Sequence, residues 1–161
     1  MRTFAASRVR RLVGAAGSTL VFSVWGCAQP AVTSSVAVPP IPPTEARLWI
    51  FRSYEPYAGR GLPAVDANGR YIGAAELGST FYRNLPPGQY LVTVETTGVD
   101  FSQSALINLA AGQDAYVKIL SSPNWVSGGL SDYERPTFYA WLIPNQVARN
   151  EVAPLAFFGG S

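Results

Sequence analysis

The sequence predicts an all-β protein built as a single small antiparallel β-sandwich. From residue 46 onward, apolar and polar residues alternate, and turn residues recur about every ten positions, as in small sandwiches and barrels. Hydrophobic residues make up 48% of the chain and charged residues only 14%, so there is ample apolar surface to bury. With 161 residues, 13 Pro and 15 Gly, the chain has room for one domain and is poorly suited to a helix bundle.

The expected elements follow from the alternation and from the turns between them. Strands are expected over 46–52, 63–67, 70–76, 80–85, 89–97, 102–109, 113–120 and 137–143. Asn68-Gly69 predicts a type I′ hairpin turn, because both residues tolerate a positive φ. Tight turns are also expected at 86–88 and 110–112, and long loops over 53–62 and 121–136. The tail, 144–161, is expected to hold a short helix over 146–151.

Strand direction then predicts which connections share an end of the sandwich. If direction reverses at each strand, the turns at 68–69, 86–88 and 110–112 lie at one end. The connections 53–62, 77–79, 98–101 and 121–136 lie at the other. The chain enters its first strand at the end with the tight turns.

The first 26 residues have the composition of a secretory signal peptide. Arg2, Arg8, Arg10 and Arg11 come first, and uncharged residues 12–25 follow them. As a helix this apolar segment is roughly 21 Å long, too short for a bilayer core of roughly 30 Å. Residues after position 11 include eight basic and ten acidic side chains, so the basic character belongs to the leader and no nucleic-acid partner is expected.

Cys27 ends the apolar segment and carries the strongest chemical signal. Val24, Trp25 and Gly26 precede it, and this run resembles the lipobox of bacterial lipoproteins, although Trp25 stands where a small residue is usual. The resemblance implies a diacylglyceryl thioether on Cys27 and cleavage before it, with membrane lipid as the partner of the acylated residue. The competing interpretation is ordinary secretory cleavage that leaves a soluble protein. Because Cys27 is the single cysteine, it has no disulfide partner within the chain.

Residues 27–45 are expected to act as a tether between the anchor and the sandwich. Five prolines lie among Ser, Thr, Val and Ala in residues 29–45, a composition typical of an extended linker. Residues 46–143 then form the sandwich, and residues 144–161 form the tail. Ala28, rather than Asp, follows Cys27, and by resemblance to the lipoprotein sorting rule this favours a periplasm-facing location on the outer membrane over the inner membrane.

The run from Val65 to Thr96 is similar to the core of prealbumin-like sandwich modules. It contains an N-G hairpin at 68–69 and the L-P-P-G-Q-Y run at 85–90. Together with the A-R-L-x-x-F-R strand at 46–52, it resembles a family of small proteobacterial lipoproteins built around such a domain. The resemblance covers roughly residues 46–120, implies a transthyretin-like or carboxypeptidase-regulatory-like fold, and brings no activity, cofactor or catalytic residue.

Aromatic and charged residues gather in the long loops. The candidate partner-binding residues are Tyr54, Tyr57, Arg60, Trp125 and Tyr133. Aromatic and Arg side chains suit a binding surface because they give large contact area for little lost rotamer freedom. The alternative is that Trp125 and Tyr133 fold over the open end of the sandwich as a lid. Trp49, Tyr139 and Trp141 lie in strands and are expected to pack in the core or on a sheet face.

The residue inventory disfavours an enzyme. There is no His, so His-ligated metals, Ser-His triads and imidazole bases are excluded, and no metal or cofactor is expected. A hydrolase would depend on carboxylates, drawn from Asp66, Asp100, Asp114, Asp132 and Glu134. The favoured function is a lipid-anchored binding or structural module of the cell envelope, with an envelope protein or a glycan as partner. The alternatives are a periplasmic carbohydrate-binding module and, less favoured, a carboxylate-based hydrolase.

Overall fold

The computed structural model describes residues 37–56, 58–96, 104–128 and 131–161. Their elements, in chain order, are β1 (Ala46–Arg52), β2 (Ala64–Ala67), β3 (Arg70–Ala74), β4 (Ser79–Leu85), β5 (Gly88–Val94), β6 (Ser104–Leu109), β7 (Asp114–Ser122), β8 (Trp125–Gly128), β9 (Ser131–Glu134), β10 (Thr137–Ile143), α1 (Asn145–Val152) and β11 (Ala156–Gly160).

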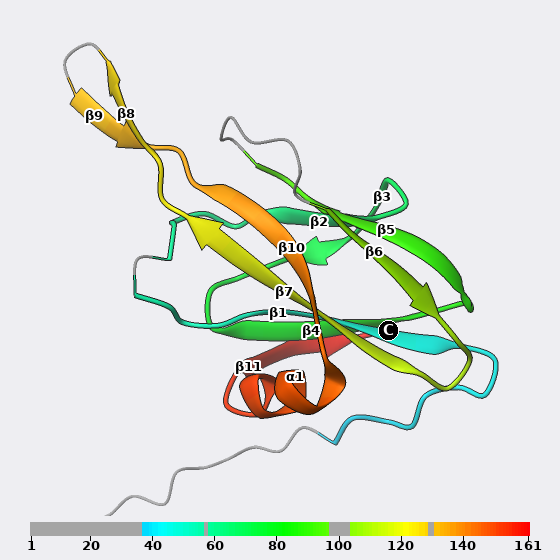
Figure 1. Cartoon of the computed structure of the whole chain (residues 1–161). Coiled ribbons are helices and arrows are strands. Elements are labelled where there is room, and N and C mark those ends of the chain that lie inside the picture. Colours follow the sequence, from blue (N-terminus) through cyan, green and yellow to red (C-terminus); the bar gives the residue numbers. More distant parts are fainter. Residues whose placement is uncertain (1–36, 57, 97–103, 129–130) are drawn as a thin grey trace, which may run out of the picture. The chain divides into compact units, whose positions relative to one another are not determined.

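Two sheets make up the domain (Figure 1). Sheet A has five strands in the order β10-β7-β1-β4-β11, and sheet B has four in the order β3-β2-β5-β6. Strands β8 and β9 form a separate two-stranded hairpin. The prediction of a mostly-β, two-sheet domain is therefore confirmed, with one short helix added.

The prediction of a purely antiparallel sandwich is wrong for sheet A. Strand β1 pairs antiparallel with β4 but parallel with β7, and β11 pairs parallel with β4. The reason is that β5 and β6 belong to sheet B, so the chain returns to sheet A in β7 running in the same direction as β1. Alternation along a strand shows which residues face inward and carries no information about the neighbouring strand's direction.

The main core lies between the two sheets. Strand β6 alternates strictly between exposed and buried residues, and β5 places Val92 and Val94 inward while Leu91 stays exposed. From sheet A, Leu48 and Ile50 meet them in the same buried cluster. Period-two alternation therefore has its expected cause here, one face packed and the other in water.

Strand β1 departs from this pattern because sheet A is covered on both faces. All seven residues of β1 are buried. On the face turned away from sheet B, Trp49, Phe51, Tyr82, Tyr116 and Ala148 of α1 form a second cluster. The rings of Trp49 and Tyr116 stack 5.9 Å apart, with 6° between their planes. A strand packed on both faces needs apolar residues at nearly every position, which explains the run ARLWIFR.

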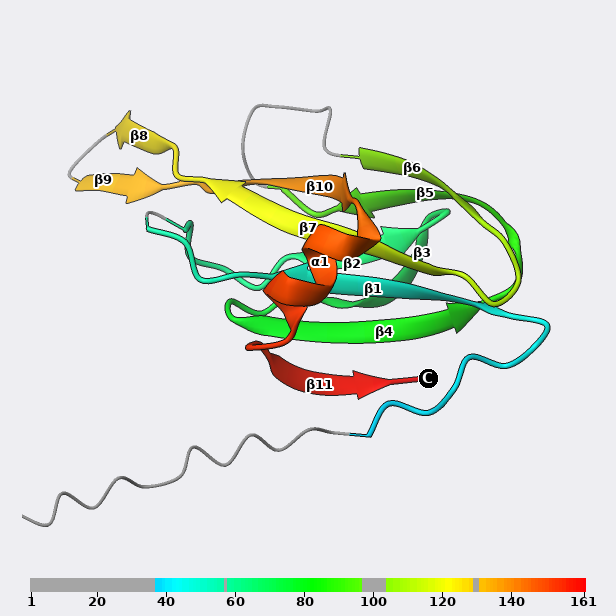
Figure 2. The same ribbon diagram turned by 60° about the horizontal axis from the view of Figure 1, so that its bottom comes forward.

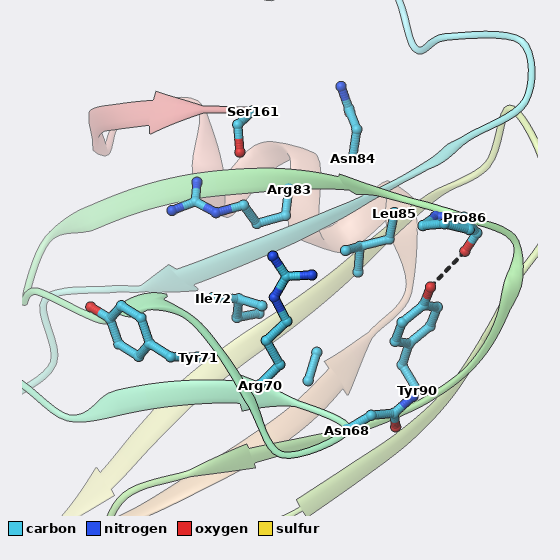
Figure 3. Close-up of a pocket in the computed structure, with 11 residues that line it drawn as sticks. Asn68, Arg70, Tyr71, Ile72, Arg83, Asn84, Leu85, Pro86, Tyr90 and Ser161 are labelled. Carbon is cyan, nitrogen blue, oxygen red and sulfur yellow. Dashed lines mark hydrogen bonds between the residues drawn. The ribbon is translucent and has the colours of Figure 1, made fainter.

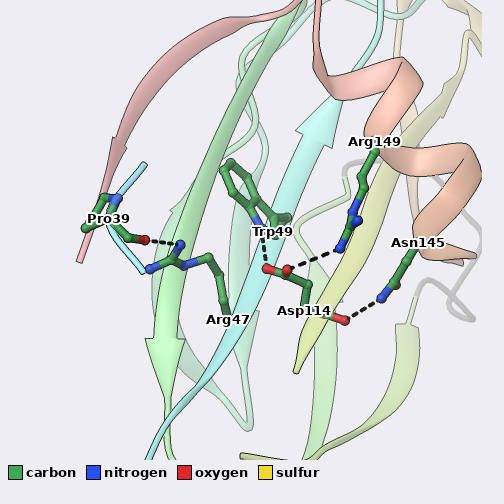
Figure 4. A network of polar contacts seen from close by, with 6 residues as sticks. All are labelled: Pro39, Arg47, Trp49, Asp114, Asn145 and Arg149. Atoms are coloured by element: carbon green, nitrogen blue, oxygen red, sulfur yellow. Dashed lines mark hydrogen bonds and ion pairs between the residues drawn. The ribbon is translucent and has the colours of Figure 1, made fainter. Parts of the chain in front are cut away.

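Asp114 fastens α1 to this outer face of sheet A (Figure 4). Trp49 Nε1 donates a 2.9 Å hydrogen bond to Asp114 Oδ1, and Arg149 Nη2 lies 3.6 Å from Asp114 Oδ2. Asn145 Nδ2 donates to the Asp114 carbonyl oxygen at 2.9 Å. Asp114, at the start of β7, thus connects β1 and α1: its carboxylate contacts Trp49 and Arg149, and its carbonyl oxygen accepts from Asn145, one turn before Arg149.

The chain after β10 crosses the outer face of sheet A. The predicted helix over 146–151 is confirmed as α1, Asn145–Val152, and the strand β11 that follows was not predicted. Strand β11 adds to the edge of sheet A opposite β10 (Figure 2). Gly160 lies so close to the Tyr82 ring that any larger residue would require the ring to move. A strand containing Gly159-Gly160 has little β propensity of its own, because glycine contributes no side chain to pack.

The predicted hairpin turn at 68–69 is confirmed. Asn68 and Gly69 have φ values of 50° and 75°, as a type I′ turn requires. The Asn68 side chain also bridges to β5: its Nδ2 donates to the Gln89 carbonyl, and its Oδ1 accepts from the Leu91 amide.

The prediction of one long loop over 121–136 is wrong, because β8 and β9 lie within it. The hairpin extends from the end of sheet A, between β7 and β10 (Figure 1). Its base is closed by a 2.7 Å hydrogen bond from the Arg135 amide to the Asn124 carbonyl, and by one of the same length from Asn124 Nδ2 to Thr137 Oγ1. Gly128-Gly129 between two short runs was a turn signal in the sequence.

Candidate functional site

Hydrogen bonds between connections define two ends of the sandwich. At one end, the Gly112 amide donates to the Glu45 carbonyl and the Asn68 amide to the Leu91 carbonyl. This is the turn end, where the chain enters β1. At the other, the Gly78 amide donates to the Arg52 carbonyl, and the Gly59 amide donates to Ser121 Oγ. This is the loop end, and the grouping of the described connections agrees with the prediction from strand direction. The connection 98–101 lies outside the described residues.

Three large apolar side chains stand exposed at the loop end. Tyr54 is 75% exposed, Trp125 is 69% exposed and Leu62 is 61% exposed. Tyr54 and Leu62 lie in the connection between β1 and β2, and Trp125 begins the hairpin. Because all three belong to connections at the same end of the sandwich, this end is a candidate interaction surface.

Tyr54 contacts the backbone of a neighbouring connection despite its exposure. Its ring lies against Gly78, which is buried and has a φ of 76°, so that a Cβ at position 78 would overlap the ring. Glycine is required there both for the backbone conformation and for the contact. A ring held by backbone loses little freedom on binding, which favours its use as an anchor.

Arg52 organises the loop beneath these side chains. It is 1% exposed, and its guanidinium donates to the backbone carbonyls of Gly59, Gly61 and Ala75. Its Cζ lies 4.9 Å from the centre of the Phe138 ring. Burial lowers the pKa of Arg52, and nearby Glu55 partly offsets that effect. The segment carrying Arg60 and Leu62 is therefore tied to the sandwich.

Lys118 fastens the segment after Tyr54 to α1. Its Nζ lies 2.8 Å from Glu55 Oε1 and 2.8 Å from Glu151 Oε2. Burial alone would lower the pKa of Lys118, but the hydrogen bonds to Glu151 and Glu55 outweigh burial and raise the pKa above its ordinary value.

A small cavity of about 280 Å³ opens beside Leu62. It is lined by Arg60, Gly61, Leu62, Pro63, Glu95, Pro136 and Phe138. Arg60 and Glu95 give it charges of both signs, and Phe138 gives it an apolar floor. The cavity has the mixed polar and apolar lining suited to one inserted side chain of a partner.

The predicted partner-binding residues differ in where the structure places them. The structure brings Tyr54, Arg60 and Trp125 to the loop end, and all three are exposed. Exposure of Trp125 contradicts the alternative in which it folds back as a lid. Tyr57 lies outside the described residues. The hairpin register places Tyr133 opposite Val126 rather than opposite Trp125.

Leu62 was missed by sequence reasoning. A leucine between two turn residues, in Gly61-Leu62-Pro63, is a weak signal because isolated exposed apolar residues are common. Trp141 was expected to pack in the core or on a sheet face; it lies on edge strand β10 and is 59% exposed. Trp49 is buried as expected.

The proposed lipidation residue Cys27 and the lipobox residues Val24, Trp25 and Gly26 lie outside the described residues. Within the part of the chain that is described, no helix is both long enough and apolar enough to cross a bilayer.

The carboxylates considered for catalysis lie on three different strands where the structure describes them, and Asp132 and Glu134 share β9. Asp66 is on β2 of sheet B, and Asp114 is on β7 of sheet A, engaged with Trp49 and Arg149. Asp100 lies outside the described residues. Among described residues, no three Cys, Asp or Glu side chains are grouped as metal ligands would be.

Comparison with protein-family models, with curated proteins and with solved structures gave no match for this chain.

Proposed function

We propose that this chain is a lipid-anchored binding module of the cell envelope that presents its loop end to a protein partner. The observation that carries the proposal is the exposure of Tyr54, Leu62 and Trp125 together at one end of the sandwich. Large apolar side chains in water are the usual anchors of protein interfaces, and Trp and Tyr are foremost among them.

The position of the tether supports the same proposal. Residues 37–45 lead into β1 at the turn end, and Arg47 Nη1 donates a 2.7 Å hydrogen bond to the Pro39 carbonyl there. An acylated Cys27, at the far end of the tether, would hold the turn end nearer the membrane. The loop end then faces away from the membrane, toward a partner in the periplasm. Outer-membrane attachment and a signal peptide over residues 1–26 are part of this proposal.

The loop end can be tested by photo-crosslinking in intact envelopes. A benzoylphenylalanine is placed at position 125, and a matched control replaces Trp141, which is also an exposed tryptophan but lies on β10. We expect a discrete crosslinked protein at position 125, absent at position 141 and reduced when Tyr54→Ala is added. Identical products at both positions, or none at 125, would refute a protein-binding loop end. Products at 125 that contain glycan instead would assign the surface to carbohydrate.

The anchor is tested separately by metabolic palmitate labelling. We expect wild type to carry the label and Cys27→Ser to lose it and to leave the membrane fraction. Label retained by Cys27→Ser would exclude lipidation at this residue without bearing on the loop end.

A further inference from the structure

A second cavity, of about 580 Å³, opens between the two sheets near the turn end (Figure 3). Edge strand β3 of sheet B forms one wall, and the second half of β4 of sheet A forms the other. Ala67, Ile72, Leu85 and Tyr90 supply apolar lining. The volume falls within the range of small-molecule sites, roughly 300–1,000 Å³.

Two arginines reach this cavity from opposite walls. Arg70 is paired with Ala67, which is buried between the sheets, so Arg70 projects from the same face of sheet B. Arg83 lies on β4 between the inward-facing Phe81 and Leu85. Figure 3 shows both guanidinium groups in the opening between β3 and β4.

Neither arginine of the cavity forms an ion pair with a described residue. The described lining includes Ser161, the last residue of the sequence, and no Asp or Glu side chain. Arg83 Nη1 donates to the Tyr82 carbonyl, and its Cζ lies 5.2 Å from the Phe81 ring centre. Arg70 is exposed and has no hydrogen-bond partner among described residues. Two arginines at one cavity contrast with the rest of the chain after residue 11, where acidic residues outnumber basic ones.

We propose that this cavity binds the phosphate group of a small phosphate-bearing molecule, with the molecule's apolar portion against Ile72 and Leu85. Guanidinium groups match phosphate oxygens in bidentate geometry. A tetrahedral phosphate offers separate oxygens to the two arginines on opposite walls. This site lies at the opposite end from Tyr54 and Trp125 and does not depend on the protein-binding proposal.

The phosphate could belong to a free phosphomonoester or to a lipid headgroup, since Asn68 and Pro86 of the cavity lie in turns at the end where the tether enters. Calorimetric titration of the full chain in a maltoside detergent separates the two. The probes are phenyl phosphate, a monoester, and glycerophosphoglycerol, the deacylated headgroup of an anionic lipid. Tighter binding of phenyl phosphate assigns a free monoester, and tighter binding of glycerophosphoglycerol assigns a lipid headgroup.

The variants Arg70→Gln and Arg83→Gln should each raise the dissociation constant by about tenfold or more, as expected for loss of a charge-assisted hydrogen bond. Arg149→Gln, which removes an equal charge from α1 on the outer face of sheet A, should leave it unchanged. Failure of both probes to bind wild type, or binding unchanged by Arg70→Gln, would overturn the proposal. Because Arg70 is exposed and has no hydrogen-bond partner among described residues, Arg70→Gln should keep the wild-type unfolding temperature. This variant therefore tests the phosphate site even if Arg83→Gln is unstable.

Discussion

Arg52 is the largest side chain that is fully buried in the described part of the domain. Its charge is balanced by backbone carbonyl dipoles from residues 59, 61 and 75. A buried cation is tolerated only when its donors are largely satisfied, and here one donor, Nε, has no partner among described residues. The arginine therefore shapes the loop end because three carbonyls depend on it.

Replacing Arg52 should destabilise the protein strongly. We expect Arg52→Met to lower the free energy of unfolding by about 3 kcal/mol, since buried carbonyls lose their donor. Denaturant unfolding followed by tryptophan fluorescence measures the change. Arg149→Met removes a guanidinium that is 64% exposed and should cost less than about 0.5 kcal/mol. Equal, small losses in both variants would show that Arg52 does not hold the loop.

The ion pairs of Lys118 should make the stability of the protein depend on pH in the alkaline range. Folding raises the pKa of Lys118 above its unfolded value of about 10.5. Its interaction with Glu151 and Glu55 therefore stabilises the folded state fully at pH values below 10.5, and this stabilisation is lost as the pH rises through the pKa of the folded state. Lys118→Arg keeps its charge throughout this range. Between pH 9 and pH 12, we expect the free energy of unfolding to fall by about 1 kcal/mol more in wild type than in Lys118→Arg. Both chains share every tyrosine, so parallel curves would remove Lys118 as the cause.

At the scale of elements, the segment from α1 to β11 makes sheet A a two-sided structure. Helix α1 spans only eight residues and packs a single fully buried residue, Ala148, against the outer cluster. A helix this short is not stable in isolation, so it depends on the aromatic surface beneath it. In return it shields Trp49 and Tyr116 from water.

The Ala148 contact can be tested by introducing a charge. Ala148→Glu buries an uncompensated carboxylate and should lower the free energy of unfolding by about 3 kcal/mol or more. Gln146→Glu introduces the same group at an exposed position of α1 and should change stability by less than about 0.5 kcal/mol. Near-ultraviolet circular dichroism, which reports the packing of Trp49 and Tyr116, should change only in Ala148→Glu. An unaltered spectrum in that variant would mean that α1 does not cover the cluster.

At the scale of the whole domain, the two ends of the sandwich differ in chemistry. The loop end exposes Tyr54 and Trp125, whereas the turn end holds the cavity with Arg70 and Arg83. The difference follows from strand direction: tight turns need Gly, Pro and Asn, while the longer connections have room for side chains unrelated to folding. The two proposed binding sites can therefore be altered independently.

Much of this organisation was determined by the sequence itself. The hairpin turn at Asn68-Gly69, the helix after Pro144 and the strand limits of β10 follow from local backbone preferences and alternation, which act within a few residues. The placement of Tyr54 and Trp125 at a shared end also followed, because strand direction needs only a count of turns. Their exposure did not, since the sequence also allowed Trp125 to fold over the end of the sandwich as a lid.

Tertiary structure alone decided the rest. The parallel pairing of Arg47 with Asp114, the addition of β11 and the meeting of Arg70 with Arg83 all join residues far apart in the chain. Such pairings are selected by burial of the outer face of sheet A and by the spacing of the two sheets. Local preference contains neither quantity, and Gly159-Gly160 forms a strand only because the edge of β4 and the Tyr82 ring are there to receive it.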